Sequence, residues 1–218
     1  HYFHDFRKKD SDYEEIFAMH KPKKLVEMLG IEDPFAGLPT LNPKGLRACQ
    51  YEAINGLEKS FRNGQNRALM VLATGAGKTY TACLASYRML AYTKMRRVLF
   101  LVDRNNLGKQ AEGEFGTFRL TENGDAFNII YSVNRLKSAK IPSDSNVVIS
   151  TIQRLFSLLK GEDITDTDDD DADNITSEVV LPENPNLPHD FFDLIIIDEC
   201  HRSIYGNWRK VLEYFDTA

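Results

Sequence analysis

The stretch Leu-Ala-Thr-Gly-Ala-Gly-Lys-Thr, residues 72–79, decides the fold of this chain. It follows a short apolar run and precedes a helical pattern, so it predicts a loop between a buried strand and a helix. Glycines allow successive backbone N–H groups of such a loop to turn inward around a phosphate, and the helix adds the positive end of its dipole. The strict motif for this loop starts with Gly, where the chain has Leu72. By itself the stretch is therefore also compatible with a loop that binds nothing.

A second string, Asp-Glu-Cys-His at residues 198–201, follows another apolar run. Parallel sheets bind ligands at the carboxyl ends of their strands, which is where both strings fall. Lys78 is then expected to contact the β- and γ-phosphates of a nucleotide, while Thr79 and Asp198 hold Mg²⁺. Glu199 is expected to orient the attacking water. A strand that ends in solvated carboxylates is the alternative, but two such strings in one chain favour a site for ATP and Mg²⁺.

The composition is that of an ordinary globular protein, with 218 residues of which 42% are hydrophobic and 27% charged. This length allows one large α/β domain and an appendage. The sequence contains neither a signal peptide nor an apolar run near the roughly 20 residues of a membrane span. We therefore expect a cytoplasmic protein with no membrane partner. Because it begins without Met, we interpret it as a piece of a longer protein.

The three cysteines, Cys49, Cys83 and Cys200, are odd in number and widely spaced. They indicate neither a disulfide framework nor a zinc site, and a reducing compartment fits them. We expect each of them to be a small buried side chain.

Negative charge is concentrated in one segment. Residues 162–173 hold eight acidic side chains and no Lys or Arg, so the rest of the chain carries +3 although the net charge is −5. A mildly basic body is compatible with a polyanionic partner. The acidic tract and the stretch 182–188 form one insertion, about residues 161–190, which we expect to be a mobile loop because like charges repel. A divalent-ion site is the alternative, but the tract lacks the Gly turn and distal Glu of a calcium loop.

The rest of the chain divides into two parts. Residues 1–45 predict short helices at 12–19 and 22–29, followed by a linker rich in Pro and Gly. From residue 46 to 218 helical and strand patterns alternate, which predicts a parallel sheet with right-handed crossovers and helices on both faces. The strands are expected at 68–73, 97–102, 127–131, 147–151 and 192–198, and the helices at 47–61, 79–92, 105–115, 152–159 and 208–215.

The order of these strings resembles the superfamily 2 helicases and translocases, and more narrowly the motor (R) subunit of type I restriction enzymes. The resemblance rests on L-R-A-C-Q at 46–50, A-T-G-A-G-K-T at 73–79, V-L-F-L-V-D-R-N-N-L at 98–107, V-V-I-S-T-I-Q-R-L at 147–155 and F-F-D-L-I-I-I-D-E-C-H-R-S-I-Y-G-N-W at 191–208. It covers residues 46–218 and implies an α/β fold, the RecA-like P-loop NTPase fold of a first helicase lobe. The missing first Gly fits the looser form that the motif takes in this superfamily.

The resemblance also implies roles for individual residues. Gln50 would read adenine, since a side-chain amide can pair with N6 and N7 together. The other nucleotide contacts would come from Arg47, Thr74, Gly75, Ala76, Gly77, Lys78 and Thr79, and catalysis from Lys78, Asp198 and Glu199. Contacts to the nucleic-acid backbone would come from Arg104, Thr151 and Gln153, for which loop and helix-cap polarity is the alternative. His201 would couple the ATP site to a neighbouring lobe, or would simply lie at the start of a helix.

By resemblance, the chain is the ATP-binding lobe of an ATP-dependent double-stranded-DNA translocase, from the restriction (R) subunit of a type I enzyme that moves DNA before cleaving it. ATP and Mg²⁺ would be its cofactors. Its partners would be double-stranded DNA, modification and specificity subunits, and a second RecA-like lobe and a nuclease domain of the same longer chain. The sequence contains no second lobe, no Ser/Thr-Ala-Thr motif and no nuclease cluster, so we expect this piece to hydrolyse ATP very slowly.

Other functions stay open at this point. The nearest is another superfamily 2 DNA motor, such as a type III restriction subunit or a repair helicase. A P-loop kinase or GTPase is a different class, against which Gln50 and the string at 198–201 argue. An interaction module that binds ATP without turnover is a further one.

Overall fold

The computed structural model describes residues 33–120, 124–138, 140–162, 181–200 and 206–215, and the backbone of two short strands before them. These are β1 (Tyr2–Phe3) and β2 (Glu14–Glu15), which pair antiparallel. β2 lies within the helix expected at 12–19, so that expectation is wrong at these two residues; isolated helices this short are marginal in water. The helix expected at 22–29 and the acidic tract from residue 163 onward lie outside the described residues.

A four-stranded parallel sheet, in the order β4-β5-β3-β6, forms the centre of the domain. Its strands are β3 (Val98–Val102), β4 (Val133–Arg135), β5 (Val147–Thr151) and β6 (Leu194–Ile197). Every residue of β3 and β5 is buried, because helices cover both faces of these strands; their side chains are apolar except for Ser150 and Thr151 at the end of β5. The register aligns Val98 of β3 with Val147 of β5 and Leu194 of β6. The predicted parallel α/β architecture is confirmed.

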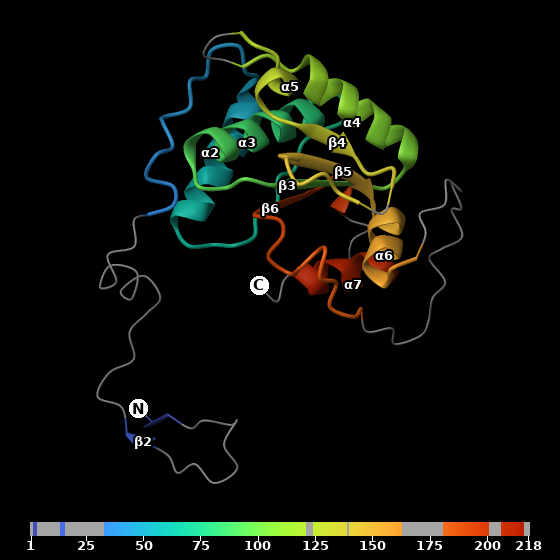
Figure 1. The fold of residues 1–218 in the computed structure, drawn as a ribbon. Helices are drawn as coiled ribbons and strands as arrows, with labels where there is room; N and C mark the ends of the chain where they lie inside the picture. Colours follow the sequence, from blue (N-terminus) through green and yellow to red (C-terminus); the bar gives the residue numbers. More distant parts are fainter. Residues whose placement is uncertain are drawn as a thin grey trace.

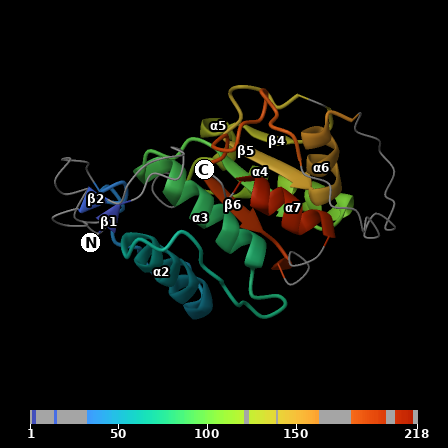
Figure 2. The same ribbon diagram turned by 90° about the horizontal axis from the view of Figure 1, so that it is seen from below.

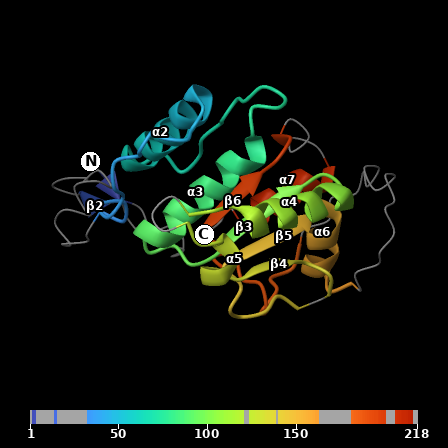
Figure 3. The same ribbon diagram turned by 90° about the horizontal axis from the view of Figure 1, so that it is seen from above.

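Helices cover both faces of this sheet (Figure 1). On one face lie α3 (Lys78–Tyr92), α4 (Asn105–Thr117) and the short α5 (Phe127–Ile130), with α2 (Ala48–Arg62) beside α3 (Figures 2 and 3). On the other face lie α6 (Ile152–Lys160) and α7 (Gly206–Phe215). Side chains of β3 alternate between the two layers: Phe100 packs with α3 and α4, whereas Leu99 and Leu101 pack with α6 and α7. Among the described helices, none is long and apolar enough to cross a membrane.

The strand expected at 68–73 does not form. These residues pair with no other strand, and the described sheet ends at β6. Met70 packs against the core, whereas Leu69 and Val71 are 72% and 85% exposed, so burial alternates as in an extended chain with one covered face. The apolar composition predicted a strand buried on both faces, but none of the described elements covers the outer face.

The strand expected at 127–131 is also wrong, because α5 replaces it and β4 follows. Phe127 and Tyr131 stand one helical turn apart, and their ring centroids are separated by 5.1 Å. Phe127 is fully buried while Ile129 is 73% exposed. A strand would place Phe127 and Ile129 on the same face, so the burial of this apolar run follows the helical period.

The last part of the predicted insertion packs against α6 and α7. The Tyr214 hydroxyl donates to the Leu187 carbonyl at 2.7 Å and accepts from the Asn184 N–H at 3.1 Å. The Asn184 side-chain amide donates to the Leu158 carbonyl at 3.1 Å, and Leu187 is itself buried. The expectation of a mobile loop is therefore wrong at residues 184–187, because one apolar anchor and three hydrogen bonds hold this segment on the helices.

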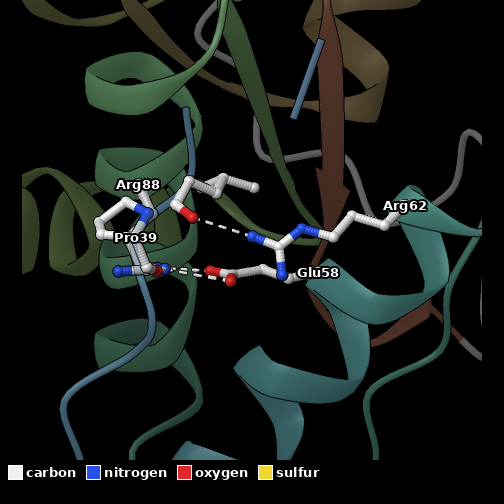
Figure 4. A network of polar contacts seen from close by, with 5 residues as sticks. Pro39, Glu58, Arg62 and Arg88 are labelled. Carbon is white, nitrogen blue, oxygen red and sulfur yellow. Dashed lines mark hydrogen bonds and ion pairs between the residues drawn. The ribbon is translucent and has the colours of Figure 1, made fainter. Parts of the chain in front are cut away.

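A buried ion pair fixes α2 and the segment before it to α3 (Figure 4). The Arg88 guanidinium donates to both carboxylate oxygens of Glu58, and the two side chains are almost fully buried. Arg88 also donates to the Pro39 carbonyl, and Arg62 donates to the Leu38 carbonyl at 2.9 Å. Removing one partner of such a pair costs about 3–5 kcal/mol, because the other charge is left buried. The pair thus sets the position of α2 beside α3.

Candidate nucleotide-binding site

The loop at 72–79 turns into α3 through two glycines. Gly75 and Gly77 have φ angles of +75° and +86°, a left-handed backbone that glycine adopts without strain. The Ala76 N–H donates to the Ala73 carbonyl at 3.1 Å, which closes a turn. Gly77 is the N-cap of α3, which begins at Lys78. The first N–H groups of a helix have no acceptors within it, so this end of α3 offers donors to an anion.

Lys78 contacts a residue from the far end of the chain. Its ammonium nitrogen lies 2.7 Å from a carboxylate oxygen of Glu199, in an ion pair that spans 121 positions of sequence. The hydrogen bond to Glu199 raises the pKa of Lys78 above its ordinary value and outweighs the opposing effect of burial. Two of the three residues expected to carry catalysis are thereby brought together.

Asp198 and Glu199 follow β6 at the edge of the sheet where the sequence places them. The Asp198 N–H donates to the Leu101 carbonyl at 2.9 Å, so the ladder with β3 continues to this residue. Burial raises the pKa of Asp198 above its ordinary value, and the adjacent Glu199 carboxylate raises it further. Glu199 has a φ of +53°, a left-handed conformation that costs a non-glycine residue about 1–3 kcal/mol and that clusters at active sites.

The oxygen donors of this site fit a magnesium ion. Thr79 offers a hydroxyl in the first turn of α3, and Asp198 offers a partly buried carboxylate. Mg²⁺ is commonly bound through one or two carboxylates together with substrate phosphates and water. In the part of the chain that the structure describes, no three His, Cys, Asp or Glu side chains gather in a way that could hold a metal. A metal here would therefore also need phosphate oxygens.

The first turn of α2 contacts the loop. The Gln50 amide nitrogen donates to the Ala76 carbonyl at 3.0 Å, and its amide oxygen accepts from the Arg47 N–H at 3.0 Å. The Arg47 guanidinium donates to the Gly75 carbonyl at 2.5 Å. The resemblance predicts that Gln50 and Arg47 contact a nucleotide, but the sequence gives no signal of their bonds to the loop. Contacts across 26 and 28 positions follow no periodic pattern.

The residues expected to contact nucleic acid lie at the same edge of the sheet. The last residue of β3 aligns with Thr151 of β5, and Arg104 lies two residues after the end of β3. The Arg104 side chain is 56% exposed and lies 3.5 Å from the Asp103 carboxylate. Thr151 is buried, and its hydroxyl accepts from the Arg154 N–H as the N-cap of α6, so the helix-cap alternative describes its side chain. Gln153 is half-buried in the first turn of α6.

The remaining candidates are His201 and the three cysteines. His201 lies outside the described residues, so its coupling role stays a prediction. Of the three cysteines, each expected to be a small buried side chain, only Cys83 is fully buried; Cys49 is exposed on α2 and Cys200 is half-buried, so the expectation is wrong for these two. Burial raises the pKa of the Cys83 thiol well above its ordinary value, which makes this side chain an inert part of the core.

Comparison with known proteins identifies a matching family model and several similar proteins. The family model described as "Type III restriction enzyme, res subunit" matches residues 43–218. The chain is similar to the Type I restriction enzyme EcoKI endonuclease subunit of Escherichia coli strain K12, with 34% identity over 91% of the chain and 17% of that protein. It is also 34% identical to the EcoAI endonuclease subunit of Escherichia coli, over 80% of the chain and 18% of that protein. The chain thus spans less than a fifth of the length of these relatives.

Proposed function

The chain belongs to the type III restriction enzyme res-subunit family, and from this premise we propose that residues 46–218 form the ATP-binding lobe of a DNA translocase. The observation that carries the proposal is the 2.7 Å contact between Lys78, at the start of α3, and Glu199, after β6. It joins the two strings that predicted a site for ATP and Mg²⁺. The names of the relatives favour the motor subunit of a type I restriction enzyme over other DNA motors of this kind.

Each part of the site has a distinct task in this proposal. The Lys78 ammonium binds the β- and γ-phosphates and offsets the charge that develops during phosphoryl transfer, while loop and helix N–H groups bind the same oxygens. Thr79 and Asp198 would hold Mg²⁺, which neutralises charge on the phosphates when it is bound. Glu199 orients the water that attacks the γ-phosphate, and Gln50 recognises adenine.

Triphosphate binding requires Lys78 to exchange its partner. Lys78 is paired with Glu199, and both side chains are about two-fifths exposed, at 38% and 41%. Such a pair is weak because solvent screens it, whereas a triphosphate presents several negative charges to the same ammonium. When Lys78 turns to the phosphates, the Glu199 carboxylate becomes available for water. Nucleotide binding and release of the catalytic carboxylate are thereby one event.

We assign DNA contact to the edge formed by the ends of β3 and β5. The exposed guanidinium of Arg104 lies after the end of β3. Gln153 lies two residues after the end of β5. We assign a single cation, Arg104, to this contact with DNA. DNA binding by this lobe should therefore be weak, indifferent to sequence and reduced by salt. Modification and specificity subunits, a second lobe and a nuclease domain are partners that we propose for the longer protein.

The proposal predicts binding that is selective for adenine and depends on Mg²⁺. We would titrate the chain with ADP and with GDP by calorimetry, each in Mg²⁺ and in EDTA. ADP should bind at least about tenfold more tightly than GDP, because a site that hydrogen-bonds one base leaves its amide poorly paired with another. EDTA should weaken ADP binding. Equal affinity for GDP would favour the GTPase class, and the absence of binding by either would refute the nucleotide site.

A further inference from the structure

The nitrogen and the oxygen of the Gln50 side-chain amide both form hydrogen bonds. It is 5% exposed, donates to the Ala76 carbonyl and accepts from the Arg47 N–H, each at 3.0 Å. Arg47 adds a second link, from its guanidinium to the Gly75 carbonyl. The N-cap residue and the first turn of α2 therefore bind two successive carbonyls of the loop at 72–79.

These contacts determine the direction of the loop's peptide planes. In a trans peptide the carbonyl and the following N–H point in opposite directions. Because the Ala76 carbonyl points at Gln50, the N–H of Gly77 points away from α2. Only glycine suits position 77 in this arrangement. Its φ is +86°, and a Cβ at this position would lie 2.5 Å from the Gln50 amide nitrogen. Inward-facing N–H groups of this kind are what allow a loop to bind phosphate.

We infer that Gln50 is a positioning residue for the phosphate-binding loop, independent of any contact that it makes with the base. The inference rests on the proposed nucleotide site and adds a second task to the same side chain. An amide has two N–H donors and two acceptor positions, of which the loop and Arg47 use one each. One donor and one acceptor are left, which is the pair that adenine requires. A single side chain can thus join the base to the loop that holds the phosphates.

A probe without a base separates the two tasks. We would measure the affinity of inorganic tripolyphosphate with Mg²⁺, and of ADP and GDP, for the chain and for two variants. Gln50→Glu keeps an acceptor for the Arg47 N–H but sets an oxygen against the Ala76 carbonyl. Gln50→Met keeps the volume of the buried side chain and removes both hydrogen bonds. Gln110→Ala, an exposed change on α4, is the matched control.

We expect tripolyphosphate affinity to fall by about tenfold in both Gln50 variants and to stay unchanged in the control, the loss expected for one hydrogen bond that orders the site. Melting curves of all variants show whether they fold, and an effect confined to stability would contradict the inference. Unchanged tripolyphosphate affinity with a lost preference for ADP would also overturn it and leave Gln50 as a base reader alone. If the unmodified chain bound no ligand, the proposed function itself would fail.

Discussion

At the scale of single residues, the Lys78–Glu199 pair is the contact on which the account of hydrolysis depends. The two groups lie 2.7 Å apart in a site where a phosphate would compete for the same ammonium. Solvent reaches both side chains, so the pair contributes little to stability and can exchange readily. Its effect should therefore be seen in ligand affinity and hardly at all in the melting temperature.

Replacing the carboxylate tests this competition. Glu199→Gln should tighten the binding of a non-hydrolysable ATP analogue by about two- to fivefold, the equivalent of roughly 0.5–1 kcal/mol for a solvent-exposed ion pair. A neutral amide competes less for Lys78 than a carboxylate does. In a Lys78→Met background the same change should have no effect on affinity, as measured by calorimetry.

The control for this experiment is Glu213→Gln, which removes a carboxylate that pairs with Arg209 on α7 at 2.7 Å. It should leave the affinity unchanged in both backgrounds. If Glu199→Gln tightens binding equally with and without Lys78, the effect is general repulsion between carboxylate and phosphate. The exchange of partners at Lys78 would then be wrong.

At the scale of elements, the segment at 184–187 should act as part of the domain. Tyr214→Phe removes the hydroxyl that bonds both Leu187 and Asn184. Two buried hydrogen bonds are worth about 1–2 kcal/mol, so the melting temperature should fall by about 2–8 °C. Tyr51→Phe on α2 is the matched control and should cause little change. An equal and small shift in both variants would show that the segment does not stabilise the fold.

The comparison between sequence and structure is clearest at the same scale. β3, β5 and β6 lie within the strands predicted for them, because their apolar runs are covered by helices on both faces of the sheet. The runs at 68–73 and 127–131 are equally apolar, but what covers them is decided by neighbours far away in sequence. The two strings that hold Lys78 and Glu199 were predicted to lie at one edge of the sheet, and they meet although residues 68–73 do not form a strand. The bond from Gln50 to Ala76 depends instead on how α2 docks against α3.

At the scale of the whole molecule, the chain should bind nucleotide but turn it over very slowly, with or without linear duplex DNA. An arginine supplied by a second lobe is worth roughly 10³–10⁵ in rate in related phosphoryl transfers. In the described part of the chain, Arg209 pairs with Glu213 and Arg104 lies against Asp103. The steady-state rate of ATP hydrolysis by this chain, with and without linear duplex DNA, tests this prediction. Strong stimulation by DNA would place a catalytic arginine within residues 1–218, with Arg202 and Arg209 the first to replace.

The central claim is that Lys78 and the carboxylates after β6 form one ATP site, and calorimetric titration of Lys78→Ala with ADP and Mg²⁺ tests it most directly. Loss of the ammonium leaves the phosphates without their main positive partner, so affinity should fall by at least about tenfold while the far-ultraviolet circular dichroism stays unchanged. Lys109→Ala, an exposed lysine on α4, should bind ADP as the unmodified chain does. Equal affinity of Lys78→Ala and the unmodified chain for ADP would contradict the assignment of this site.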